Sequence, residues 1–295
     1  MEGLVNRHYS DPKVRLEIAT FSQSRWVGIH CTVKTRLGRP ILLRYFRGRP
    51  MRIQGEEDVG RLLNAFRGLG PRTFYGTANV YVKLENPEDV SSIDNVVSCT
   101  PTWDIDNSPE AWKATVEAAK EIVSFLESEG VTQSIYVKWS GRGCHVHIHD
   151  KAFSREMRKR ISPLDIGYAV VGYVIMKLDG KFSNIRSSFP GSLLRVDNEM
   201  DIQRLFTCPL SLHKELDRVC VCIGLNELDE FIPEWTTVGT YRHYDGWNRW
   251  YEGEADALAE KACNVVGSYP SRSSHRRRNP PVDEQISRWV KLKTS

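Results

Sequence analysis

The sequence predicts an α/β protein built on a mostly antiparallel or mixed sheet, and its central third carries the observations behind this prediction. Residues 95–106, 134–139 and 144–149 are rich in β-forming residues, and the last two segments are close enough to form a hairpin. Between the first two, apolar residues recur at three- and four-residue steps over 109–129, as in a helix with one buried face. The resulting order, β-α-β-β, is typical of a layered α/β architecture.

Local signals predict where these elements begin and end. Ser108 and Pro109 suit an N-cap and a first helical turn, and Gly130 suits the position just after a helix. The sequence predicts further elements on both sides: helices over 14–27, 152–161 and 163–177, and strands over 74–82, 192–196 and 218–223.

The formal net charge of the 295 residues is only +4, so the total charge does not predict a nucleic-acid partner. The distribution of charge is more informative. Residues 35–52 contain six arginines and no acid, and residues 271–278 contain four arginines and one histidine. Aromatic residues are interleaved with the first group, which favours nucleic-acid contacts at Arg44, Arg47 and Arg49. The alternatives are a solvated surface for the first group and a disordered tail for the second.

The cysteines and the apolar runs predict a cytoplasmic protein with no membrane partner. None of the seven cysteines belongs to a CxxC pair, and an odd number without a secretory pattern suits reduced thiols. The opening residues, MEGLVNRHYSD, include no apolar signal segment, and no apolar run is long enough to cross a bilayer. In a prokaryote we expect such a protein to be associated with the nucleoid.

Asp104 and Asp106 lie two residues apart on a predicted strand, so both carboxylates leave the same face. Carboxylates this close repel each other unless they share a proton or a divalent cation. A hard cation such as Mg²⁺ or Mn²⁺ would bind both carboxylates together with substrate phosphates. The alternative is a pair of exposed acids at the end of a strand.

The stretch SGRGCHVHIHD, residues 140–150, offers donors for an anion. Its two glycines let backbone N–H groups converge, Ser140 adds a hydroxyl and Arg142 adds a charge suited to phosphate. The alternative is a hairpin turn with a solvated arginine. The alternating His145, His147 and His149 also suit a zinc or iron site, although the nearby carboxylates favour Mg²⁺ or Mn²⁺ elsewhere.

Asp197, at the end of a predicted strand, is a candidate third carboxylate for the same metal cluster. Arg204 and His213 follow it in RLFTCPLSLH and add a cation and a donor. In the alternative interpretation, Asp197 is a turn residue beside Asn198.

In this order the segments resemble the catalytic small subunit of archaeo-eukaryotic DNA primases. The similarity is carried by Asp104-Ile105-Asp106, by SGRGCHVHI, and by Asp197 followed by RLFTCPLSLH, and it spans roughly residues 6–225. The resemblance implies an RRM-like catalytic palm with an N-terminal α/β module. The implied catalytic domain covers 1–269, with the module at about 1–94, the palm at about 95–225 and a helical remainder; a basic tail follows at 270–295.

The resemblance also implies roles for individual residues. The metal-binding and catalytic carboxylates would be Asp104, Asp106 and Asp197, holding two Mg²⁺ or Mn²⁺ ions. The contacts to the incoming nucleotide would be Ser140, Arg142, His145, Arg204 and His213. The turn is one residue shorter than in many relatives, which leaves His147 as an alternative to His145. Residues 107–139 contain neither Cys nor His, so no zinc is expected there.

The implied activity is template-directed nucleotidyl transfer, by a DNA primase or a primase-like polymerase. The helix over 109–129, in place of a zinc-binding insertion, resembles the polymerase domains of bacterial end-joining ligases. A primer-dependent repair polymerase and a non-catalytic single-strand-binding relative are therefore the alternatives. The implied partners are a DNA template and NTPs or dNTPs, with a primase large subunit or a repair ligase as protein partner.

Overall fold

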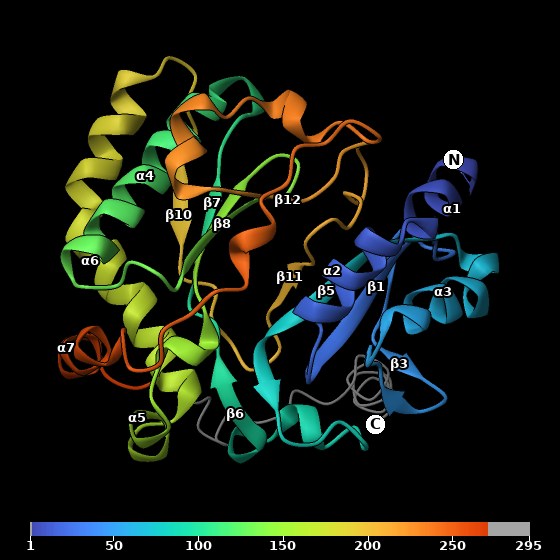
Figure 1. Ribbon diagram of the computed structural model, residues 1–295, viewed down its shortest axis with the longest axis horizontal. Coiled ribbons are helices and arrows are strands. Elements are labelled where there is room, and N and C mark those ends of the chain that lie inside the picture. The colour runs from blue at the N-terminus through green and yellow to red at the C-terminus, as the bar shows by residue number, and fades with distance from the viewer. Residues whose placement is uncertain (1, 271–295) are drawn as a thin grey trace, which may run out of the picture.

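The computed structural model describes residues 2–270, and two five-stranded sheets that lie next to each other form its framework (Figure 1). The predicted basic tail over 270–295, with the arginines of 271–278, lies outside the described residues apart from position 270. Among the described residues, no helix combines the length and the apolar character that a membrane span requires.

The first sheet, here called the palm sheet, has the strand order β10-β7-β9-β8-β12, and all neighbouring strands are antiparallel. Its strands are β7 (Thr102–Asp106), β8 (Ile135–Trp139), β9 (Cys144–Ile148), β10 (Arg195–Asp197) and β12 (Val221–Ile223). Helix α4 (Trp112–Ser128) connects β7 to β8, and α6 (Pro163–Ser188) precedes β10. The predicted β-α-β-β order is confirmed, and α6 and β10 complete the RRM-like unit.

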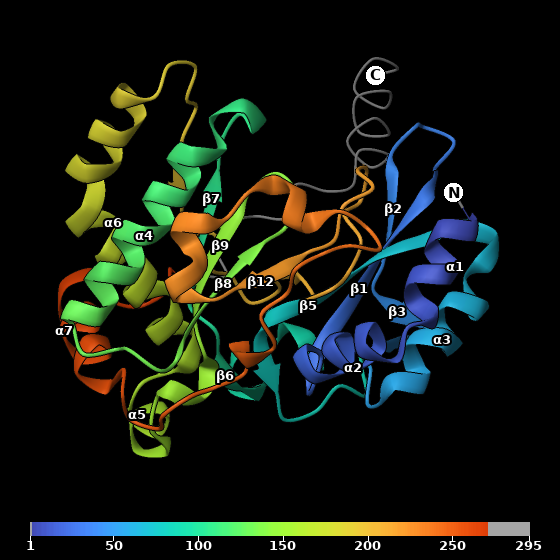
Figure 2. The same cartoon turned by 45° about the horizontal axis from the view of Figure 1, so that its top comes forward.

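Helices α4 and α6 cover one face of the palm sheet (Figures 1 and 2). Trp103 and Ile105 of β7 point toward these helices and are fully buried. The indole N–H of Trp103 donates to the carbonyl oxygen of Val171 in α6 at 3.2 Å. Because side chains alternate along a strand, Asp104 and Asp106 therefore lie on the opposite face, toward the second sheet.

The second sheet, here called the N-terminal sheet, has the order β11-β5-β1-β2, with β6 also paired to β5. Its strands are β1 (Arg25–Lys34), β2 (Pro40–Leu43), β5 (Pro71–Tyr81), β6 (Val96–Cys99) and β11 (Leu205–Thr207), and β3 (Tyr45–Phe46) and β4 (Arg49–Pro50) form a separate hairpin. Strands β6 and β11 come from residues beyond 94. The module and the palm therefore exchange segments rather than divide at one point in the chain.

The remaining elements are short. The helices are α1 (Glu2–Ser10), α2 (Pro12–Phe21), α3 (Glu56–Ala65), α5 (Arg155–Arg160) and α7 (Asp256–Val266). The 3-10 helices are η1 (Arg67–Leu69), η2 (Asp89–Ser91), η3 (Ile93–Asn95), η4 (Pro109–Ala111), η5 (Asp150–Ala152), η6 (Leu225–Glu230), η7 (Pro233–Thr236) and η8 (Asp245–Trp247).

Three predicted elements differ from the structure, and local backbone chemistry explains two of them. The helix expected over 163–177 continues to Ser188 as α6. The helix expected over 14–27 ends at Phe21, and the left-handed backbone of Ser24, with φ of 54°, turns the chain into β1. The strand region expected over 95–106 is two strands in different sheets, β6 and β7. Pro101 separates them, and because proline has no N–H to donate, it cannot continue a ladder.

Buried polar contacts join the two sheets. Arg25 of β1 donates to Asp150 at 2.9 Å and to Thr100 at 2.9 Å, and both side chains of the Arg25–Asp150 pair are less than a tenth exposed. Lys138 of β8 is fully buried and donates to the carbonyl oxygen of Thr207 in β11 at 2.8 Å. These contacts fix the spacing of the sheets on either side of the polar palm face.

Candidate active site

Asp104 occupies the centre of the polar palm face, between two functional side chains on neighbouring strands. It lies directly opposite His145 of β9 on one side and Asp197 of β10 on the other. Residues directly opposite each other across antiparallel strands share a face and lie close together. The strand register therefore brings together three of the residues that the sequence predicts for the site.

Two groups of positive character contact the Asp104 carboxylate. Arg204 Nη2 lies 2.6 Å from Oδ2, and His145 Nε2 lies 3.3 Å from Oδ1. Arg204 also pairs with Glu199. Burial by itself raises the pKa of Asp104, but His145 and Arg204 outweigh that effect and lower it. Asp104 is therefore held ionised.

The other two carboxylates have different surroundings. Burial, followed by repulsion from Asp104, raises the pKa of Asp106, and no ion pair to Asp106 occurs among residues 2–270. Asp197 pairs with Arg195 at 2.5 Å. As the side chains lie, the three carboxylates do not gather their oxygen atoms within 4.8 Å of one another.

The donor chemistry of this site fits Mg²⁺ or Mn²⁺. All three candidate ligands are hard carboxylate oxygens on adjacent strands. Burial, and after it repulsion from Asp104, raises the pKa of Asp106, and a bound cation would offset both effects. Binding requires side-chain rotations, above all of Asp197 away from Arg195.

The SGRG turn closes against this face, and its glycines are required by close approaches. A Cβ at Gly143 would lie 2.8 Å from the carbonyl oxygen of Ile105. A Cβ at Gly141, whose φ is +121°, would lie 2.7 Å from Cδ2 of His213. Ser140 and Gly143 close the turn through a backbone hydrogen bond of 2.9 Å. Arg142 extends from it to Glu215 at 3.4 Å.

His213 is fixed as a neutral donor. Its Nδ1 accepts the backbone N–H groups of Glu215 at 3.1 Å and Leu216 at 3.0 Å. The proton of the neutral ring therefore lies on Nε2. Burial, reinforced by Arg142 and Lys214, lowers the pKa of His213 to about 4. At neutral pH the ring donates one hydrogen bond without carrying charge.

These groups line one cleft of about 360 Å³ between the two sheets. Of the predicted site residues, it is lined by Asp104, Asp106, Ser140, Arg142, His145, Arg204 and His213; Asp197 is not in its lining. Lys214, Tyr75 and Phe206 also line it and were not predicted. Lys214 directly follows His213 in the chain, so the sequence could have predicted it as a residue of the site. Tyr75 and Phe206 lie in the cleft only because β5 pairs with β11.

The two histidines of β9 and His149, which follows the strand, do not converge on a metal. His147 is fully buried, stacks on Tyr136 with ring centroids 4.5 Å apart, and lies 2.7 Å from Thr102 Oγ1. His149 bonds to Asn248 at 2.8 Å and stacks on Trp250. The three-histidine alternative is therefore wrong. Because only His145 lines the cleft, the geometry favours it over His147 as the nucleotide contact.

The predicted nucleic-acid residues lie outside this cleft. Arg44 lines an adjacent hollow of about 730 Å³, which shares Arg204 and Leu205 with the cleft. Arg47 and Arg49 line a third hollow of about 900 Å³ on the N-terminal side. The arginine-rich segment is therefore divided between two hollows.

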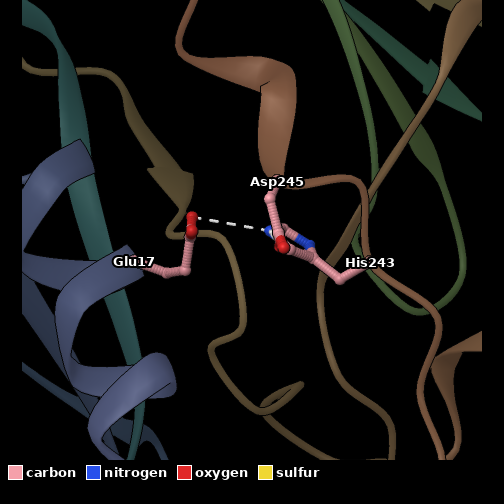
Figure 3. Close-up of side chains that lie close together, drawn as sticks. All are labelled: Glu17, His243 and Asp245. Carbon is pink, nitrogen blue, oxygen red and sulfur yellow. Dashed lines mark ion pairs between the residues drawn. The ribbon is translucent and has the colours of Figure 1, made fainter.

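A second acidic cluster lies at the junction of α2 and η8, where His243 faces Glu17 and Asp245 (Figure 3). Within residues 2–270, this is the one group of three such side chains with ligand atoms within 4.8 Å of one another. However, His243 Nδ1 accepts the backbone N–H of Cys222 at 3.0 Å. The neutral ring therefore carries its proton on Nε2, the atom that faces Glu17 at 3.5 Å. This leaves no lone pair for a cation, so the cluster is better explained as a structural contact.

Comparison with known proteins supports the fold. No family model matches the sequence, and no curated protein does. Among solved structures, the chain is similar to the polymerase domain of ligase D from Mycobacterium tuberculosis, solved in complex with DNA. The TM-score is 0.51 at 11% identity, and the match covers 90% of this chain and 88% of that one. The mixed helix-and-sheet fold expected from the sequence is thereby confirmed, and it is similar to the fold of that polymerase domain.

Proposed function

We propose that this chain is a metal-dependent, template-directed nucleotidyltransferase, a primase or primase-like polymerase that initiates or extends strands on a DNA template. The observation that carries the proposal is the register that places Asp104 between His145 and Asp197, with Asp106 beside them. The similarity to a polymerase domain supports the same class of activity.

In this proposal Asp104, Asp106 and Asp197 hold two divalent cations. Cations bound there would lower the pKa of the primer 3′-hydroxyl and neutralise charge on the triphosphate and the leaving pyrophosphate. The carboxylates suit this role because Asp104 is held ionised, Asp106 has no ion pair among the described residues, and Asp197 becomes available once it leaves Arg195.

The opposite wall of the cleft would orient the triphosphate. His213 presents a neutral N–H donor, Ser140 a hydroxyl and Arg142 a charge at the mouth of the cleft. His145 lies between Asp104 and the wall of the cleft that would orient the triphosphate. Arg204, bound to Asp104 here, is the cation best placed to transfer to phosphate. Arg44, Arg47 and Arg49 would contact nucleic acid.

Replacing Asp104 by Asn tests the proposal. We expect nucleotide incorporation on a primed DNA template to fall by at least about 100-fold, because the replacement removes a charge from the reacting centre. Asp179→Asn, an exposed acid on α6 without an ion pair in the described residues, is the matched control and should retain activity. Both variants should keep the wild-type melting temperature within a few degrees. Incorporation by Asp104→Asn at the control rate would rule out the site.

The second candidate is a polymerase that requires a pre-existing 3′ end and serves gap filling or end joining. The similarity to a ligase D polymerase domain favours it specifically. Synthesis on an unprimed circular single strand, compared with the same strand carrying a primer, separates the two. Labelled NTPs and dNTPs, in Mg²⁺ and in Mn²⁺, should be tested in parallel. Products only from the primed strand would identify the repair-type enzyme, whose protein partner would be a ligase rather than a primase large subunit.

A non-catalytic relative is the remaining alternative. Such a protein would bind single strands without incorporating any nucleotide, whatever the metal. Three carboxylates beside groups that would bind phosphate argue against this alternative, because without a cation the carboxylates repel nucleic acid.

A further inference from the structure

The six arginines of residues 35–52 form a run of positive charge that contains no acid. Among the described residues, none of them forms an ion pair with a carboxylate. Arginines elsewhere commonly do, as in the pairs Arg25–Asp150, Arg72–Asp217 and Arg195–Asp197. An uncompensated group of fixed cations attracts a polyanion.

Arg44 lines a hollow that adjoins the catalytic cleft, and Arg47, Arg49 and Arg52 line a third hollow. Arg204 and Leu205 line both the cleft and the second hollow, where Arg44 forms another part of the wall. Met51 donates its backbone N–H to the carbonyl oxygen of Arg44 at 2.9 Å and itself lines the third hollow. The second hollow therefore adjoins the cleft, and the third hollow adjoins the segment that carries Arg44.

Arg44 is held rigidly in the wall of the second hollow. Its guanidinium lies 3.3 Å from the centroid of the Trp26 ring and donates to the carbonyl oxygen of Gln203 at 3.1 Å. The Trp26 indole in turn donates to the carbonyl oxygen of Arg44 at 2.7 Å. The Nε atom of Arg44 is buried and has no hydrogen-bond partner among the described residues. Burial lowers the pKa of Arg44 to about 10, which still leaves the group charged at neutral pH.

An exposed aromatic ring and further cations follow Arg44. The Tyr45 side chain packs by its edge on Trp26, with centroids 5.3 Å apart, while Tyr45 is 41% exposed. The third hollow is lined by Arg47, Arg49 and Arg52. The acid in its lining, Asp58, is already paired with Arg61.

We propose that Arg44, Tyr45, Arg47, Arg49 and Arg52, together called the arginine track, bind the unpaired template strand as it passes to or from the catalytic cleft. The arginines would contact successive phosphates, and Tyr45 would stack on a base. An exposed ring gains stacking energy only from an unpaired base, which is why the partner is single-stranded rather than duplex. The link to a template depends on the proposed polymerase function; the preference for single strands does not.

Strand binding without nucleotide or metal tests the track directly. The probe is a fluorescein-labelled oligothymidylate of about 16 nucleotides, measured by anisotropy over a salt series. The triple variant Arg47→Gln/Arg49→Gln/Arg52→Gln should weaken binding at least about tenfold and reduce the salt slope by about 2, as expected for three lost phosphate contacts on a single strand. Its control removes three exposed positive charges from α5: Arg155→Gln/Lys159→Gln/Arg160→Gln.

Tyr45 allows a second test of the proposal, which depends on stacking rather than on charge. Tyr45→Leu should weaken oligothymidylate binding about fivefold or more with an unchanged salt slope, and Tyr45→Phe should restore it, because stacking needs the ring and not the hydroxyl. A blunt duplex of the same length should bind more weakly than the single strand. Binding by the track variants within twofold of wild type, an equal loss in the α5 control, or a preference for duplex would each overturn the proposal.

Extension assays then separate the track from the polymerase function. On a primed template with a long 5′ overhang, the track variant should raise the KM for template about tenfold and leave the KM for nucleotide unchanged. If wild type incorporates nothing yet the binding results hold, the polymerase function fails and the track remains. If Asp104→Asn abolishes synthesis while the track variants bind and extend normally, the track fails and the function remains.

Discussion

The histidines of β9 differ in chemistry although they alternate along one strand. His145 contacts a carboxylate in the cleft, whereas His147 is enclosed by Tyr136, Phe206 and Thr102. The Thr102 hydroxyl donates its single proton to the carbonyl oxygen of Thr100 at 3.0 Å, so His147 Nδ1 must be the donor in the contact between them. Burial, with Lys138 and His145 nearby, lowers the pKa of His147 well below its ordinary value.

This neutral histidine gives the protein a pH-dependent stability. In the unfolded chain His147 binds a proton as the pH falls through about 6.5, and in the folded chain it does not. The free energy of unfolding should therefore fall below pH 6.5, by up to about 1.4 kcal/mol per pH unit for this residue. Urea denaturation between pH 7.5 and about 5 measures the slope. His147→Asn should have a smaller slope, and an equal slope in both proteins would contradict the assignment.

At the scale of the element, the SGRG turn acts by bringing the chain close to His213. Gly141 has a left-handed φ of +121° and leaves no room for a Cβ beside the imidazole. Gly130, after α4, also has a positive φ, +91°, but a Cβ there would meet nothing within 4 Å. Substitutions at the two glycines can therefore be compared to separate the effect of backbone strain from the effect of displacing His213.

Gly141→Ala should raise the KM for the incoming nucleotide about tenfold, which corresponds to losing one hydrogen bond to a charged group. The cause would be displacement of His213 rather than unfolding. Gly130→Ala carries a comparable backbone cost and should leave the KM unchanged. Steady-state incorporation and melting temperatures for both variants are the measurements. A KM that rises equally in both would attribute the effect to strain alone.

At the scale of the whole molecule, the cleft exists because two sheets are held at a fixed separation. Arg25 donates to Asp150, to Thr100 and to two carbonyl oxygens of β5. Each N–H group on its two Nη atoms therefore has a hydrogen-bond acceptor. Ser98 supplies a further hydrogen bond to Asp150 at 2.6 Å. Such a pair costs desolvation to form, but it is expensive to break on one side only.

Asp150→Ala should therefore destabilise the fold by about 3–5 kcal/mol, because Arg25 would remain buried without its counter-charge. The control is Glu260→Ala, which breaks the Arg160–Glu260 pair on the surface, where the two side chains are 59% and 52% exposed. We expect less than about 1 kcal/mol there. Urea midpoints for the two variants provide the comparison, and similar losses would show that Asp150 does not join the sheets as described.

The sequence alone determined the elements that local chemistry specifies. Periodicity predicted α4, although the expected N-cap Ser108 precedes the 3-10 turn η4 and makes no side-chain capping bond. Alternation predicted β8 and β9, and the DxD spacing placed Asp104 and Asp106 on one face. The sequence also proposed Asp197 and His213, for which the resemblance to primases implies roles, and strand register places Asp197 opposite Asp104 while His213 lines the cleft. The predictions of α4, β8 and β9 succeed because each depends on residues within a few positions of one another.

Only the tertiary structure decided which of these residues work together. Strand register paired Asp104 with His145 and Asp197, and it buried His147 one step further along the same face. The pairing of β11 with β5 brought Tyr75 and Phe206 to the cleft, and the folded chain placed Arg44 in one hollow and Arg47, Arg49 and Arg52 in another. Such contacts join residues far apart in the chain, and their free energy comes from burial between sheets, which no local pattern records.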